Sequence, residues 1–70
     1  MHRVPVTSKN IRSIGYDSAT STLEIEFNDF SIYTYSGVPL SLHAGLMQAT
    51  SKGSFLAKHV KGKFMHGKIK

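Results

Sequence analysis

The stretch TLEIEFNDFSIYTYS, residues 22–36, decides the fold, because two alternating segments flank a turn within it. In the first segment Leu23, Ile25 and Phe27 alternate with threonine and glutamate, which is the pattern of a half-buried antiparallel strand. The second segment, residues 30–36, alternates in the same way after an asparagine–aspartate pair that favours a turn. The sequence therefore predicts a hairpin near the middle of the chain.

The length of the turn decides which face of the hairpin carries Tyr33 and Tyr35. A two-residue turn puts Ile32 opposite Ile25, and both tyrosines then face away from the apolar side. A three-residue turn through Phe30 instead puts Tyr33 opposite Ile25. Both tyrosines then join the apolar side, and Ile32 faces outward. Because a shift of one residue exchanges the two faces of a strand, spacing alone leaves both registers open.

Further segments on both sides of the hairpin complete the expected architecture. Residues 11–17, IRSIGYD, predict a first strand, in which Ile11 is out of step, so that the strand starts late or carries a bulge. After the hairpin, residues 40–49 and 55–61 have apolar side chains at helical spacing. We expect an α+β fold of order β-β-β-α-α, a three-stranded antiparallel meander with two short helices packed on one face.

A chain of 70 residues without cysteine indicates one small domain with no disulfide. We place this domain at residues 4–64, between flexible tails at residues 1–3 and 65–70. A chain of this length buries only ~60% of its unfolded surface, so we expect little room for a substrate pocket of ~300 Å³ or more. Neither a signal peptide nor a membrane span is evident, which favours a cytoplasmic protein without a membrane partner.

The positive charge of the chain is concentrated in its last twenty residues. Up to Thr50 there are three basic and four acidic residues, whereas six lysines and no acid follow. Such asymmetry favours a polyanionic partner, often nucleic acid. The ordinary alternative is a solvated lysine face that keeps a small protein soluble.

Six short segments in order, SIGYD, TLEIEF, YTY, GVP, ATSKGSF and VKGKF, resemble the KTSC domain. This family is named for its occurrence at the C-terminus of some lysyl-tRNA synthetases, and its hallmark is a Tyr-x-Tyr pair, matched by Tyr33 and Tyr35. The resemblance implies a bacterial domain without an assigned active site, whose synthetase context suggests RNA binding. The family usually has glycine at the position of Phe30, which implies the three-residue turn.

Charge and resemblance together predict a non-enzymatic module that binds nucleic acid, RNA rather than DNA. The alternative is a module for protein–protein interaction or self-association. No catalytic residue or cofactor is expected, and the four histidines lack the spacing of a metal site. The expected phosphate ligands are lysines with one possible arginine, and the two tyrosines are either structural or stack on bases: Lys52, Lys58, Lys61, Lys63, Arg12, Tyr33 and Tyr35.

Overall fold

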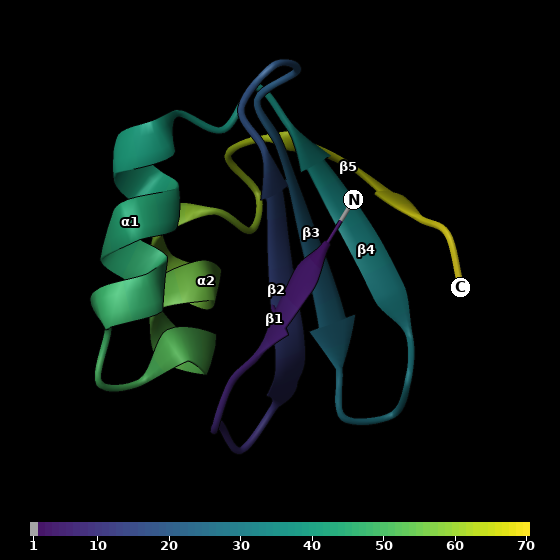
Figure 1. Ribbon diagram of the computed structural model, residues 1–70, viewed down its shortest axis with the longest axis vertical. Coiled ribbons are helices and arrows are strands. Elements are labelled where there is room, and N and C mark those ends of the chain that lie inside the picture. Colours follow the sequence, from purple (N-terminus) through teal and green to yellow (C-terminus); the bar gives the residue numbers. More distant parts are fainter. Residues whose placement is uncertain (1) are drawn as a thin grey trace.

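A computed structural model describes residues 2–70, which form a five-stranded antiparallel sheet with two helices on one face (Figure 1). The strands lie side by side in chain order: β1 (Arg3–Pro5), β2 (Ile11–Asp17), β3 (Thr22–Phe27), β4 (Ile32–Ser36) and β5 (Met65–Lys68). The helices are α1 (Leu40–Gln48) and α2 (Lys52–His59). The α+β class and the helices on one face are confirmed, but the predicted three strands are only the centre of the sheet.

The two strands that the sequence analysis omits form the edges of the sheet. At one edge β1 pairs with β2, and at the other β5 pairs with β4. The sequence predicts a tail over residues 65–70, but the structure places Met65–Lys68 in β5. Its residues MHGK show no apolar alternation, so β5 forms only because β4 offers unpaired backbone groups along its edge. Arg3 likewise belongs to β1, whereas Met1 lies outside the described residues.

The hairpin between β3 and β4 has the three-residue turn. The backbone N–H of Phe27 donates to the carbonyl of Ser31 at 2.9 Å. In the resulting register Tyr33 lies opposite Ile25, and Tyr35 lies opposite Leu23 on the same face. Of the two registers that spacing allows, the structure therefore has the one that turns both tyrosines toward the helices.

Phe30 closes this turn in a backbone conformation that glycine usually takes. Its φ is 71°, in the left-handed region that bulky side chains rarely adopt. Two sets of contacts hold it there. The carboxylate of Asp29 accepts hydrogen bonds from the backbone N–H and the hydroxyl of Ser31, at 3.0 and 2.6 Å. The guanidinium of Arg12 lies 4.8 Å from the centre of the Phe30 ring, close enough for a cation–π contact.

A β-bulge in β2 accounts for the irregular position of Ile11 in the sequence pattern. Ile11 pairs with Phe27, yet Ser13 pairs with Glu26, so one extra residue is inserted between the two pairs. The bulge returns Ile14 to the face that already carries Ile11. Both isoleucines are therefore buried under the helices. In a regular strand, residues three apart would point to opposite faces, and one of the two would be on the outer face.

The outer face of the sheet, away from the helices, carries a polar network. Glu24 is only 8% exposed and accepts a hydrogen bond from the guanidinium of Arg3. Arg3 also donates to the hydroxyl of Ser13 at 3.2 Å, and Ser13 donates to Glu26 at 2.9 Å. Because an unpaired buried carboxylate is costly, the β1 arginine allows Glu24 to lie within the sheet.

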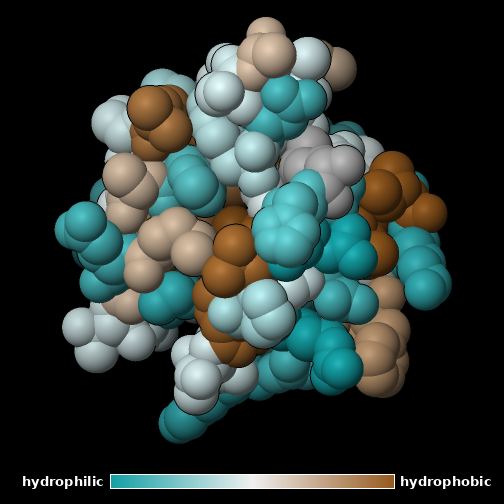
Figure 2. All heavy atoms as spheres, in the orientation of Figure 1, coloured by the Kyte–Doolittle hydropathy of each residue, from teal (hydrophilic) through white to brown (hydrophobic). Residues whose placement is uncertain are grey.

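Figure 2, drawn in the orientation of Figure 1, shows a surface on which hydrophobic residues form separate groups among hydrophilic ones. Large hydrophobic side chains that are exposed come from both termini, from the β3–β4 turn and from the start of α1: Val4, Phe30, Leu40, Met65 and Ile69. Neither of the helices within residues 2–70 is long and apolar enough to cross a membrane.

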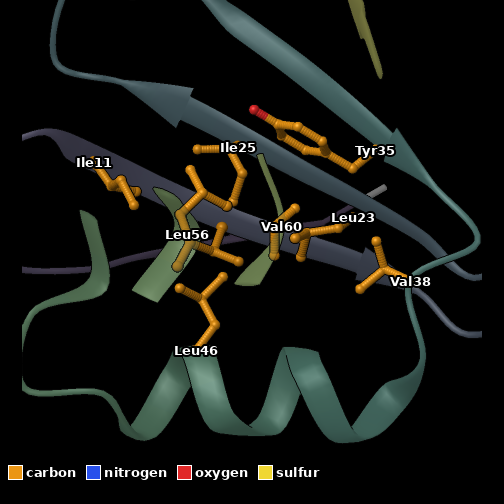
Figure 3. Packing of buried hydrophobic residues seen from close by; sticks show 9 residues of the cluster. Ile11, Leu23, Ile25, Tyr35, Val38, Leu46, Leu56 and Val60 are labelled. Carbon is orange, nitrogen blue, oxygen red and sulfur yellow. The ribbon is translucent and has the colours of Figure 1, made fainter. Parts of the chain in front are cut away.

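The hydrophobic core lies between the sheet and the two helices (Figure 3). Leu46 of α1 and Leu56 of α2 have no exposed surface, and Figure 3 shows both side chains directed at the strands. Tyr35 is part of this cluster, with only 3% of its surface exposed. Burying each aliphatic side chain of this size contributes roughly 1.5–3 kcal/mol, which offsets the entropy lost when so short a chain folds.

The α2 helix begins before the apolar stretch 55–61 that indicates it in the sequence. Its first residue is Lys52, and Ser51, one of two serines that could cap it, is the N-cap. The Ser51 hydroxyl accepts a hydrogen bond from the backbone N–H of Ser54 at 3.4 Å. After the helix, Gly62 has a φ of 78° and turns the chain back toward β5.

Pairing of β5 with β4 can be tested by removing residues 65–70. Ile32 donates its backbone N–H to Lys70 and accepts from Ile69 at 2.8 Å, and only 6% of Ile32 is exposed. Truncation after Phe64 removes these bonds and exposes Ile32. We expect the free energy of unfolding, measured by urea denaturation, to fall by about 2 kcal/mol or more. Loss of less than about 0.5 kcal/mol, as for a surface change, would contradict the pairing.

The register can be tested by comparing the two tyrosines. Because Tyr35 is 3% exposed in the core, Tyr35→Ala should lower the free energy of unfolding by about 3–5 kcal/mol. Tyr33 packs at the margin of the core and is half-buried, so Tyr33→Ala should cost about 1–2 kcal/mol. Thermal and urea unfolding of both variants measure the difference. Small, equal losses would place both rings on the outer face and contradict the register.

Candidate nucleic-acid interface

A cleft of about 710 Å³ opens where β3, β4 and β5 meet α2 and the loop after it. This volume lies within the ~300–1,000 Å³ typical of small-molecule sites. The sequence predicts little room for a pocket inside so thin a core, and this cleft lies at the rim of the core, where it is open to solvent. We call it the aromatic cleft, since four rings and two lysines are prominent in its lining: Phe27, Tyr33, Tyr35, His66, Lys9 and Lys61.

The rings of the aromatic cleft are in contact with one another. Phe27 and Tyr33 pack edge to face, with ring centres 5.6 Å apart and planes at 82°. The ring of His66 lies 6.2 Å from Tyr33 and 5.9 Å from Tyr35, tilted toward both. Because His66 of β5 pairs with Tyr35, the edge strand adds an imidazole ring beside the tyrosines of the hairpin. The result is a wall of partly accessible aromatic surface.

Positive charge lies at the same cleft. The ammonium of Lys61 is 5.2 Å from the centre of the Phe27 ring. Lys61 is held there because its backbone N–H, like that of Val60, still bonds to the carbonyl of Leu56 at the end of α2. Lys68 of β5 pairs with Tyr33 and so lies on the same face of the sheet. These lysines are exposed, so their charge is available to a partner.

One carboxylate also lines the cleft. The hydrogen bond from the Ser31 hydroxyl, followed by that from the Ser31 backbone, holds the pKa of Asp29 below its usual range. The positive charge of Lys68 acts in the same direction. Asp29 is therefore an anion at neutral pH, and it opposes any phosphate placed directly against it.

Two further pKa shifts bear on the chemistry of this region. Burial, and secondarily the neighbouring Tyr33, raises the pKa of Tyr35, so its phenol stays neutral at physiological pH. His43 lies outside the cleft, with its ring stacked on Tyr16 at 4.7 Å. Burial lowers the pKa of His43, which favours the neutral ring at pH 7. His43 therefore adds no cation to the interface.

The structure separates the four lysines that the sequence analysis groups. Lys61 lines the cleft. Lys52 is half-buried and donates to the carbonyl of Ala49 at 3.1 Å, which bridges the end of α1 to the start of α2. Lys58 is exposed on α2, and Lys63 is exposed in the turn that follows. In the part of the chain that the structure describes, none of these lysines forms an ion pair with a carboxylate.

Arg12 does not join the lysines. It lies at the bulge of β2, where its Nε is 3.9 Å from Glu26 Oε1 and its guanidinium covers Phe30. Together with Arg3 and Ser13 it lines a second hollow, of about 560 Å³, on the outer face of the sheet. The prediction that Arg12 contributes to the same phosphate site is therefore not supported by its position.

Several residues of the cleft were not found by sequence reasoning. Lys9 and Asn10 come from the loop between β1 and β2, and this loop docks on the β3–β4 turn. There Asn28 donates its backbone N–H to the carbonyl of Asn10 at 2.9 Å and its side-chain amide to that of Lys9 at 2.7 Å. Loop docking leaves no periodic signal, and neither does the β5 strand that carries His66.

The described residues show no group of three or more histidine, cysteine, aspartate or glutamate side chains arranged to hold a metal ion. The lining of the cleft offers aromatic rings, ammonium groups, amides and the carboxylate of Asp29. Aromatic faces suit planar ligands, and ammonium groups suit anions.

Comparison with known proteins agrees with this architecture. The crystal structure of a KTSC domain protein from Yersinia pestis is 46% identical in sequence and matches with a TM-score of 0.95, over 99% of this chain and 97% of that one. A lysine–tRNA ligase of Trichormus variabilis is 41% identical over 59 residues, which are 84% of this chain and 10% of the ligase. This chain thus spans about a tenth of that ligase.

A small uncharacterized protein of Stutzerimonas stutzeri is 40% identical over 53 residues, covering 76% of this chain and 75% of that protein. The family model of the KTSC domain matches residues 7–64, which include the central strands, both helices and the Tyr33/Tyr35 pair. On this match and these relatives, the chain belongs to the KTSC domain family.

Proposed function

We propose that this chain is a binding module for single-stranded RNA and that the aromatic cleft with its flanking lysines is the interface. The observation that carries the proposal is the joint lining of one cleft by aromatic rings and ammonium groups, above all the Lys61 ammonium 5.2 Å from the Phe27 ring. Proteins that bind single strands combine these two elements, stacking for bases and positive charge for phosphates.

Electrostatics supports the same partner. The chain carries a net charge of +5, and both arginines lie against glutamates on the outer face. The lysines after Thr50 therefore account for the surplus, and Lys61 and Lys68 lie on the side of the sheet that bears the cleft. A phosphate backbone that approaches this side meets ammonium groups that can displace the cations condensed on the RNA.

The relatives point to RNA rather than DNA. A region similar to this chain lies within lysine–tRNA ligases from two Nostoc strains and from Trichormus variabilis. Those proteins are named for a tRNA substrate. For this chain we propose only the same class of nucleic acid, RNA, and not the same substrate. The proposed activity is binding, without a catalytic step.

The competing hypothesis is a protein-interaction surface, which an exposed Ile32 beside the exposed Phe30 would favour. Ile32 is instead 6% exposed, next to the β5 extension. The exposed hydrophobic residues on the face shown in Figure 2 form separate groups rather than one patch. RNA binding is therefore the function that the surface supports better.

The proposal can be tested by titrating a fluorescent RNA oligonucleotide of about ten nucleotides at several salt concentrations. If Lys9, Lys61 and Lys68 contact phosphates, the logarithm of the association constant should fall with the logarithm of salt at a slope of about −2. Lys61→Gln should weaken binding and make the slope shallower by about 0.7. Fluorescence anisotropy provides both quantities.

Lys58→Gln is the matched control, because it removes the same charge from an exposed position on α2 that does not line the cleft. We expect this control to bind nearly as the unmodified protein does. Absence of binding at low salt, a slope near zero, or equal losses in the two variants would each overturn the cleft as an RNA interface.

A further inference from the structure

We infer that the aromatic cleft is a nucleobase pocket: it takes one unpaired base against the rings of Tyr33 and His66, while Lys61 contacts the adjoining phosphate. This inference rests on the proposed RNA binding and adds to it the group that is recognised. A surface of lysines alone would bind only the phosphate backbone, whereas a pocket for a base binds a planar base that has left the stack of its neighbours.

The first argument is the accessible ring surface in the cleft. Tyr35 is buried in the core and is engaged by its neighbours, but Tyr33 and Phe27 are half-buried and His66 is exposed. The tilt of 43° between the Tyr33 and His66 rings leaves an angled aromatic wall rather than a closed stack. A flat heterocycle can stack on such a wall, and every base has the π-face that this requires.

The second argument is the polar rim. The Asn28 side chain is fixed because its amide nitrogen donates to the carbonyls of Lys9 and Ser8, at 2.7 and 3.4 Å. Asn10 reaches the opposite element, α2, where a Cβ added to Gly53 would lie 2.9 Å from the Asn10 amide nitrogen. Glycine thus lets Asn10 lie against the helix. Because both amide hydrogens of Asn28 are engaged, its side chain offers a base only the carbonyl oxygen as an acceptor, whereas the Asn10 carboxamide carries both donors and an acceptor.

The third argument is the distribution of charge inside the cleft. Asp29 lines the same cavity as Lys61, so a phosphate is repelled from one part of it and attracted to another. A carboxylate in the lining disfavours a free anion in that part of the cleft. A base is neutral, and an exocyclic amino group such as that of cytosine can donate a hydrogen bond to a carboxylate. The mixed lining therefore fits a nucleotide better than it fits phosphate alone.

The test compares an oligocytidine RNA with an RNA of equal length and charge in which abasic ribose replaces every nucleotide. At low salt we expect the oligocytidine to bind at least about fivefold more tightly, the lower end of one stacked base. Tyr33→Leu, which keeps an apolar side chain, should bring the ratio of the two affinities close to one. His43→Leu is the control, because it removes a ring that lies outside the cleft.

A second measurement avoids any substitution in the cleft. Titration of the unmodified protein with cytidine 5′-monophosphate should shift the NMR signals of the Tyr33 and His66 rings and leave those of His43 in place. Shifts confined to these cleft rings support the pocket. Absence of ring shifts at saturating nucleotide, or equal shifts at His43, would overturn it whether or not Tyr33→Leu folds.

The outcomes separate the two proposals. Suppose that the oligocytidine and the abasic RNA bind with equal affinity, and that both bind more weakly to the Lys61→Gln variant. In that case the module recognises only the phosphate backbone. That result overturns the nucleobase pocket and leaves RNA binding standing. If neither RNA binds at low salt, both proposals fail.

Discussion

The register of the β3–β4 hairpin is the constraint on which the rest of the structure depends. Because the turn contains three residues, Tyr33 and Tyr35 share a face with Ile25 and Leu23, under the helices. With one residue fewer in the turn, both rings would leave the core and the cleft. The register is held by a left-handed Phe30 and by the Asp29–Ser31 contacts, so a strained turn sets the position of the aromatic surface.

The two faces of the sheet divide the charges of the chain. On the outer face, Arg3 and Arg12 lie against Glu24 and Glu26, so these side chains largely cancel. The helix side keeps Lys61 and Lys68 without a carboxylate partner at salt-bridge distance in the described chain. The division follows from strand alternation, because glutamates two residues apart on β3 must share a face. Part of the net charge of +5, that of Lys61 and Lys68, thus lies on the side of the sheet that bears the cleft.

The cleft combines parts of the chain that are far apart in sequence. The β1–β2 loop contributes Lys9, the hairpin contributes Phe27 and Tyr33, and the C-terminal segment contributes Lys61 and His66. Each part is held by backbone pairing or loop hydrogen bonds, not by the core alone. A domain of this size can therefore form a pocket at its rim even though its core is thin.

The sequence by itself determined the three central strands, both helices, the α+β class and the accumulation of lysine near the C-terminus, since each is written in local periodicity or composition. It could not determine the hairpin register, because an alternating strand fits either face equally well, nor β5, whose residues MHGK carry no apolar pattern. Those features arise from long-range pairing of backbone groups. The same pairing places Lys61 beside the rings and Arg12 away from them. Such pairing depends on which edge is left open after the core has packed, and only the tertiary structure specifies that edge.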